Sequence, residues 1–220
     1  MLFRSPQLLA KQALPAEHEG LNHCSLMSLP HQLGGGTLGA NAFRQGPYLQ
    51  LPPDPDSSQS RRIGVVWAAG RKLDDAFAAR EYRKRSLPLA VLQQLLEGLR
   101  QQGWLPINLQ VGPDRDQLPA ELAALFHQAL PPEADFLEAG HWLESLQAVI
   151  SVDTAMAHQA GAQGRPGLVL LPWSADPRWL RNRSDTPWYP SLQLLRQQAP
   201  GQWQPLIAAL LEQLEQGQNP

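Results

Sequence analysis

A short run of residues, Asp153 to His158, has the side chains and spacing to hold a phosphate group. Asp153 or Thr154 can cap a helix that begins there. The first N–H groups of such a helix carry partial positive charge and bind phosphate oxygens readily. Ala155 is small enough to let a ligand approach the backbone, and the His158 imidazole could donate to a phosphate or sugar oxygen. The alternative is a plain helix cap followed by a packed histidine.

A second segment, residues 71–85, concentrates positive charge. It holds six of the chain's 18 Lys and Arg residues: Arg71, Lys72, Arg80, Arg83, Lys84 and Arg85. Read as a loop that ends just before a helix, this segment could form a positive funnel for a diphosphate. One or two of the six are expected to touch ligand, with Arg85 and Arg71 as the candidates. The alternative is a solvated loop whose charges are partly offset by Asp74, Asp75 and Glu81.

A third segment follows the second predicted strand, residues 105–111. Gln110 could donate to or accept from a ribose or a base, and Gly112 permits a tight turn beside it. The segment therefore predicts a nucleoside contact.

Several familiar site patterns are missing from the sequence. No Gly-x-Gly-x-x-Gly follows the first predicted strand and no Walker sequence occurs, which disfavours a dinucleotide oxidoreductase and an NTPase. The six histidines show no metal-ligand spacing. A net charge of −2, with only Phe77 and Tyr82 as aromatics within the basic segment, disfavours a nucleic-acid binder. We therefore expect a metal-free diphosphate site that uses no cofactor.

Short apolar runs alternate with helical patterns from residue 62 onward. The predicted strands are 63–68, 105–111, 134–137, 148–152, 167–171 and 192–196. The first predicted helix follows residue 88, and the others span 118–130, 142–146, 154–163, 177–182 and 203–214. This alternation predicts an α/β fold with a doubly wound, parallel, six-stranded Rossmann-like sheet of order 3-2-1-4-5-6. The first and fourth strands are then neighbours at the topological switch point, where ligands bind beyond the carboxyl ends.

The chain divides near residue 60. Residues 1–60 are rich in Gly and Pro turn signals and predict an irregular segment that lies over the following domain or packs on a partner, and residues 61–220 predict the nucleotide-binding domain. Cys24 is the only cysteine, so the chain forms no internal disulfide. No apolar run reaches the roughly 18 residues that a membrane span needs, and a cytoplasmic protein is expected.

At residues 150–162, followed by Gly164-Arg165-Pro166, the sequence resembles the Asp-Thr-x-x-x-His segment of heptosyltransferase-like glycosyltransferases. It is more similar still to a bacterial group in which such a domain follows tetratricopeptide repeats. The resemblance covers roughly residues 20 to 215, and the other matching segments are 24–31, 63–68, 85–89, 171–173, 178–180, 187–190 and 200–203.

This resemblance implies the GT-B fold, in which two Rossmann-like domains face one another. The C-terminal domain binds a nucleotide-diphosphate sugar, generally without a catalytic metal, and the N-terminal domain helps to bind the acceptor. Carried over by motif, Asp153, Thr154 and His158 would hold the donor diphosphate and sugar. Arg85 would counter phosphate charge, and Gln110 would lie near the nucleoside.

The chain departs from the family at its N-terminus. Residues 1–60 are interpreted as a linker and a remnant of the acceptor-side domain, which a partner chain could supply. The family's acidic base lies on that side, so no catalytic residue is assigned; Glu17, Glu19 and His31 are the nearby candidates. The acceptor, whether glycan, lipid-linked or protein, is undetermined. The two hypotheses are a glycosyltransferase, or its donor-binding portion, and a non-catalytic nucleotide-binding or interaction module derived from a truncated GT-B enzyme.

Overall fold

A computed structural model describes residues 46–52, 61–71 and 73–217, all of which belong to one compact unit, Phe43–Pro220. These residues form a six-stranded sheet of order β3-β2-β1-β4-β5-β6, in which every neighbouring pair is parallel. The predicted fold class and strand order are thus confirmed. The rest of residues 1–60, with Glu17, Glu19, Cys24 and His31, lies outside the described residues, as does Lys72.

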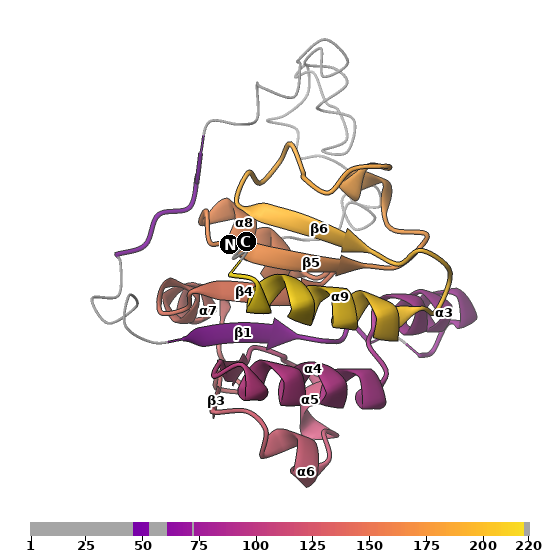
Figure 1. The fold of residues 1–220 in the computed structure, drawn as a ribbon, viewed down its shortest axis with the longest axis horizontal. Coiled ribbons are helices and arrows are strands. Elements are labelled where there is room, and N and C mark those ends of the chain that lie inside the picture. Colours follow the sequence, from indigo (N-terminus) through magenta and orange to yellow (C-terminus); the bar gives the residue numbers. More distant parts are fainter. Residues whose placement is uncertain (1–45, 53–60, 72, 218–220) are drawn as a thin grey trace, which may run out of the picture. The chain divides into compact units, whose positions relative to one another are not determined.

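The strands are short and their carboxyl ends all lie at one edge of the sheet (Figure 1). Their bounds are β1 Arg62–Val66, β2 Leu105–Asn108, β3 Gln128–Ala129, β4 Ala148–Val152, β5 Gly167–Leu171 and β6 Leu192–Arg196. Every residue of β4 and β5 is buried, because helices cover both faces of the central sheet. This explains why these strands are continuous apolar runs in the sequence.

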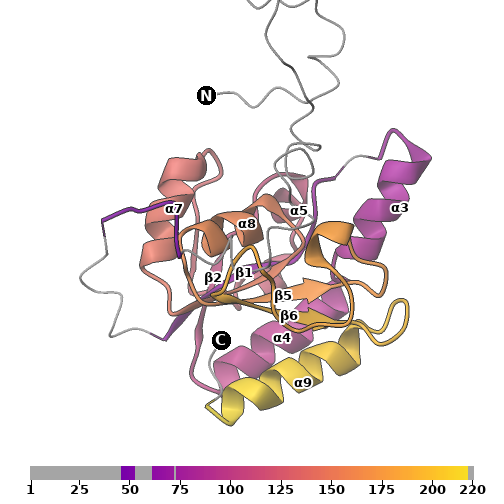
Figure 2. The same ribbon diagram turned by 90° about the horizontal axis from the view of Figure 1, so that it is seen from above.

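The helices form a layer on each face of the sheet, as Figure 2 shows. On one face α4 (Leu89–Gln101) packs beside α9 (Trp203–Glu215), and both bury leucines at helical spacing in the largest core cluster. On the other face lie α7 (Phe136–Glu144) and α8 (Ala155–Ala162). No helix in the described part of the chain is long and apolar enough to cross a membrane.

The basic segment differs from its prediction, because most of it is helical rather than a loop. Helix α3 spans Ala76–Arg85 and begins at Asp75, whose carboxylate accepts from the N–H groups of Phe77 and Ala78. It buries only Ala79. A helix without an apolar face gives no periodic signal, which is why the pattern did not reveal it.

The region between β2 and α7 also differs from its prediction. The third strand is Gln128–Ala129, where both residues are exposed, and not 134–137, where Phe136 already begins α7. The predicted helix over 118–130 is wrong, because that span holds only the single turn α6 (Ala120–Ala123) and then β3; another single turn, α5 (Pro113–Asp116), precedes it. Pro119 separates the two turns because its ring and missing N–H interrupt a helix.

Candidate functional site

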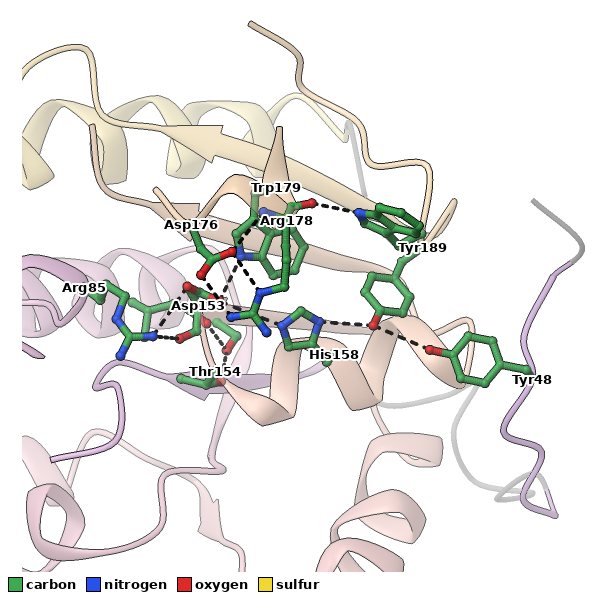
Figure 3. Close-up of polar contacts among 12 residues, drawn as sticks. Tyr48, Arg85, Asp153, Thr154, His158, Asp176, Arg178, Trp179 and Tyr189 are labelled. Atoms are coloured by element: carbon green, nitrogen blue, oxygen red, sulfur yellow. Dashed lines mark hydrogen bonds and ion pairs between the residues drawn. The ribbon is translucent and has the colours of Figure 1, made fainter. Parts of the chain in front are cut away.

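Arg85 is held at the carboxyl end of β1 by the chain that follows it. The Leu87 N–H donates to the Trp67 carbonyl at 2.8 Å. The Ala69 N–H donates to Ser86 Oγ at 3.1 Å. These two bonds fix the junction of α3 and α4 against the end of β1. The Arg85 guanidinium therefore reaches across the switch point to the end of β4 (Figure 3).

Asp153 follows β4 directly and is only 2 % exposed. Its Oδ1 accepts from Trp179 Nε1 at 2.8 Å, and its Oδ2 accepts from Arg85 Nη1 at 3.5 Å. Arg85 Nη1 also donates to the Asp153 carbonyl at 3.4 Å. The carboxylate thus gathers two donors from distant parts of the chain, and it points into the protein rather than toward a ligand.

The head of α8 has no side-chain cap among the described residues. Thr154 is the N-cap residue with extended backbone, but no described side chain accepts from the first turn. Its hydroxyl lies 3.0 Å from Ser151 Oγ instead, and the Asp153 carboxylate is used by Trp179 and Arg85. The expectation that either side chain caps the helix is therefore wrong. Ala155, the first residue of α8, is exposed, which leaves the helix head open to an anion.

His158 lies one turn into α8, and its ring contacts Trp179 and Tyr189. It stacks on Trp179, with ring centroids 4.9 Å apart and planes inclined by 14°. Its Nε2 lies 3.9 Å from Asp153 Oδ1 and is buried without a hydrogen-bond partner among the described residues. Burial, and then the positive charge of Arg178, lower the pKa of His158. The imidazole is therefore neutral at pH 7.

Tyr189 orients the histidine from the other side. Its hydroxyl lies 3.1 Å from His158 Nδ1 and accepts from the Tyr48 hydroxyl at 3.5 Å. We assign the imidazole proton to Nε2, which faces Asp153 Oδ1 at 3.9 Å. In this tautomer Tyr189 donates to Nδ1 while it accepts from Tyr48. The Tyr189 ring packs directly on Gly161, where an added Cβ would lie 2.3 Å from the ring carbon Cγ. A glycine at this position of α8 is thus required for the contact.

The strap, residues 46–52, supplies Tyr48. The Tyr48 and Leu49 N–H groups both donate to the Ala162 carbonyl, at 2.9 and 3.0 Å, at the end of α8. Leu51 lies against Gly140 of α7, where an added Cβ would approach the leucine side chain within 2.6 Å. The described part of the predicted N-terminal segment therefore lies over the domain.

A second arginine follows β5 in a single turn of 3-10 helix, η3 (Pro177–Trp179). Arg178 donates through Nε to Asp176 Oδ1 at 2.9 Å and through Nη2 to Oδ2 at 3.3 Å. Burial would raise the pKa of Asp176, but these hydrogen bonds and the charges of Arg178 and Arg85 lower it below its ordinary value. The Asp176 carboxylate is thus ionised and occupied by Arg178.

The other predicted site residues lie apart from the head of α8. Arg71 donates to Gln117 Oε1 at 2.5 Å. The Gln110 amide is buried and accepts from the Trp67 and Ala68 N–H groups at 3.2 and 2.9 Å, so its polar atoms tie β2 to β1. Gly112 precedes α5 with a φ of 78° and open space around it. A nucleoside contact at Gln110 and Gly112 stays a prediction.

Several residues of the network had no role in the sequence prediction. Asp176, Arg178, Trp179, Tyr189 and Tyr48 are brought in from the strap and from the long connection between β5 and β6. Arg178, Trp179 and Tyr189 lie in two of the segments, 178–180 and 187–190, on which the sequence resemblance rests, and this was the available signal. Among the described residues, no cluster of three or more His, Cys, Asp or Glu side chains could hold a metal ion.

No protein-family model matches the chain, and neither does any curated protein sequence. Solved structures share its fold. The E. coli heptosyltransferase WaaC with ADP aligns at 17 % identity and a TM-score of 0.55, covering 89 % of this chain and 57 % of that one. The same enzyme with ADP-2-deoxy-2-fluoro heptose aligns at 18 % identity and a TM-score of 0.53, covering 75 % and 45 %. The chain thus spans little more than half of that heptosyltransferase.

Proposed function

We propose that the domain binds the nucleotide-diphosphate sugar of a glycosyltransferase. The observation that carries this proposal is the meeting of Arg85 with the uncapped head of α8, where Arg85 Nη1 lies 3.4 Å from the Asp153 carbonyl. A fixed cation and free helix N–H groups, placed together at the switch point, suit a diphosphate. The likeness of fold to a heptosyltransferase that was solved with ADP supports the same ligand class.

The network around Asp153 explains how the site stays ready for an anion. Asp153 neutralises part of the Arg85 charge and fixes its direction, while Trp179 and His158 form a rigid wall beside α8. The neutral His158 keeps one N–H donor, at Nε2, without a partner among the described residues. Buried donors left unpaired are uncommon, and they are expected where a ligand completes the hydrogen bonding.

In this proposal catalysis rests on stabilising the diphosphate as it leaves. Negative charge that develops on the leaving group is met by Arg85 and by the dipole of α8. Such a mechanism requires no metal, and the donor is a substrate rather than a cofactor. Within the wider fold, the sequence motifs favour the bacterial group associated with tetratricopeptide repeats, acting in the cytoplasm on a glycan, a lipid-linked or a protein acceptor.

A specific observation favours the second candidate, a module that binds nucleotide without turnover. In the described part of the site, the two nearest carboxylates are both engaged: Asp153 by Trp179 and Arg85, and Asp176 by Arg178. Neither is placed to take a proton from an acceptor hydroxyl. Another chain, or residues outside those described, would then supply the base.

Calorimetric titration with ADP, GDP, UDP and CMP tests the shared part of both candidates. Binding of at least one nucleotide is expected, and it should weaken in Arg85→Gln and His158→Ala. Hydrolysis or transfer from the matching nucleotide sugar would identify an enzyme, whereas binding without turnover would identify the module. Absence of binding by all four nucleotides would contradict both.

A further inference from the structure

A cavity of about 500 Å³ lies at the carboxyl ends of β5 and β6, beside η3. Its lining includes Trp173, Arg181 and Arg196, and it shares no lining residue with the head of α8. The volume is in the range of pockets that hold small ligands, roughly 300–1,000 Å³. Trp179 separates the two places, because its side chain contacts Asp153 while its carbonyl accepts from Arg196 Nη2 at 3.4 Å.

The charges of the connection between β5 and β6 divide into two kinds. Arg178 and Arg183 each form an ion pair with a carboxylate, at 2.9 and 2.6 Å. Among the described residues, no carboxylate forms an ion pair with Arg181 or Arg196, the two arginines that line the cavity. Burial, and then the charge of Arg181, lower the pKa of Arg196. Two like charges thus face one cavity without a counter-ion from the described chain.

The backbone that carries Arg181 is held in a conformation that costs energy. Leu180 has a φ of 55° with a ψ of −171°, and Asn182 has a φ of 53°. The Leu180 combination is one that residues other than glycine rarely adopt, and such strain concentrates at ligand sites. Arg196 fixes the strained turn, because its Nη2 donates to the Leu180 carbonyl at 2.9 Å. Arg181 follows this turn directly, and it lines the same cavity as Arg196.

We propose that this cavity binds an anionic group, a phosphate or a carboxylate, carried on a sugar-sized molecule. Guanidinium groups match the geometry of both anions. A bound anion would supply the negative charge that no described carboxylate provides to Arg181 and Arg196. Trp173 is 55 % exposed at the rim, where its flat face can lie against a ring. The site does not depend on the function proposed for the head of α8.

The test follows the indole N–H signal of Trp173 by NMR in the full chain, assigned through its loss in Trp173→Phe. The probes are glucose 6-phosphate, glucuronate and, as the neutral control, glucose. Arg181→Gln removes one cation, and Arg183→Gln is the matched control in the same turn. Arg85→Gln reports any phosphate that binds at the head of α8 instead.

Glucose 6-phosphate, glucuronate or both should shift the Trp173 signal saturably, whereas glucose should not, and the anion that acts identifies its source. Affinity should fall about tenfold in Arg181→Gln and stay within about twofold in Arg183→Gln and Arg85→Gln. The proposal is overturned if neither anion shifts the signal, if glucose shifts it equally, or if Arg181→Gln binds as well as Arg183→Gln.

Discussion

The ends of β2 and β4 differ in how they use a polar residue at the same edge of the sheet. The side-chain amide of Gln110, which follows β2, accepts hydrogen bonds from the backbone at the end of β1. The carboxylate of Asp153, which follows β4, accepts hydrogen bonds from the side chains of Trp179 and Arg85, which come from two other segments. A buried polar group that binds backbone fastens the sheet, whereas one that binds side chains assembles a site.

Replacing each of these residues by alanine should separate the two uses, with the largest effect at Asp153. Asp153→Ala should lower the free energy of unfolding by roughly 3 kcal/mol, because it strands a buried indole N–H and a partly buried guanidinium. It should also weaken nucleotide binding. Gln110→Ala should cost about 2 kcal/mol by leaving backbone N–H groups unpaired, with a smaller loss of nucleotide affinity than in Asp153→Ala. Urea unfolding measures the free energies, and calorimetry measures the nucleotide affinities. Equal losses of affinity in the two variants would contradict the different roles of Asp153 and Gln110.

Arginine substitutions sharpen the same comparison at two side chains that are only partly buried. Arg85→Gln should weaken nucleotide binding about 10- to 100-fold, since a charge-assisted hydrogen bond to phosphate is lost. Arg71→Gln, which removes a contact with Gln117 at the end of α5, should change affinity by less than about twofold. Titration calorimetry on both variants checks this. A larger loss in Arg71→Gln would move the phosphate site toward β2.

The lowered pKa of His158 gives the end of β4 a pH dependence. The unfolded imidazole takes up a proton below about pH 6.5, whereas the folded one resists it to a lower pH. The unfolded state therefore binds more protons in this window, and stability should fall as pH drops through it. Thermal unfolding between about pH 7.5 and 5.5 should show a smaller loss in His158→Gln than in the wild type. An identical loss in both would contradict the assignment of a neutral histidine.

Substitution in the strap should have the smallest effect on the free energy of unfolding. The Tyr48 hydroxyl is exposed and lies 3.5 Å from that of Tyr189, so Tyr48→Phe should cost less than about 0.5 kcal/mol. Tyr189→Phe removes the bond to His158 and should cost about 1 kcal/mol. Nitrogen NMR shifts of His158 should show the Nε2–H tautomer in the wild type and in Tyr48→Phe, and a mixture in Tyr189→Phe. No change in Tyr189→Phe would contradict the role of Tyr189 in fixing the tautomer of His158.

The central strands of the sheet could be predicted from sequence because they are buried on both faces. The fourth, fifth and sixth strands were predicted with the bounds that the structure has, since each is a short run rich in apolar residues between turns. β3 and α3 carry no such pattern: β3 is exposed, and α3 buries only Ala79. A periodicity argument cannot find elements that have no buried face.

The candidate site was only partly predictable for a related reason. The strand order predicted that Arg85 and Asp153 lie near the ends of the neighbouring strands β1 and β4, and the two side chains are in contact. Spacing along the chain could not show that Trp179 lies under Asp153, 26 positions away, or that Tyr48 reaches Tyr189 over 141 positions. It also could not show that Asp153 faces inward, because a cap and a buried acceptor use the same residue type.

The most direct test of the central claim compares the bound nucleoside diphosphate with its parent nucleoside. We expect the wild type to bind the diphosphate at least about tenfold more tightly than the nucleoside, because in the proposed site Arg85 and the head of α8 contact the diphosphate. Arg85→Gln should lose most of that difference while retaining nucleoside affinity. Equal affinity for the two ligands in the wild type, or an unchanged difference in Arg85→Gln, would contradict a diphosphate site at the head of α8.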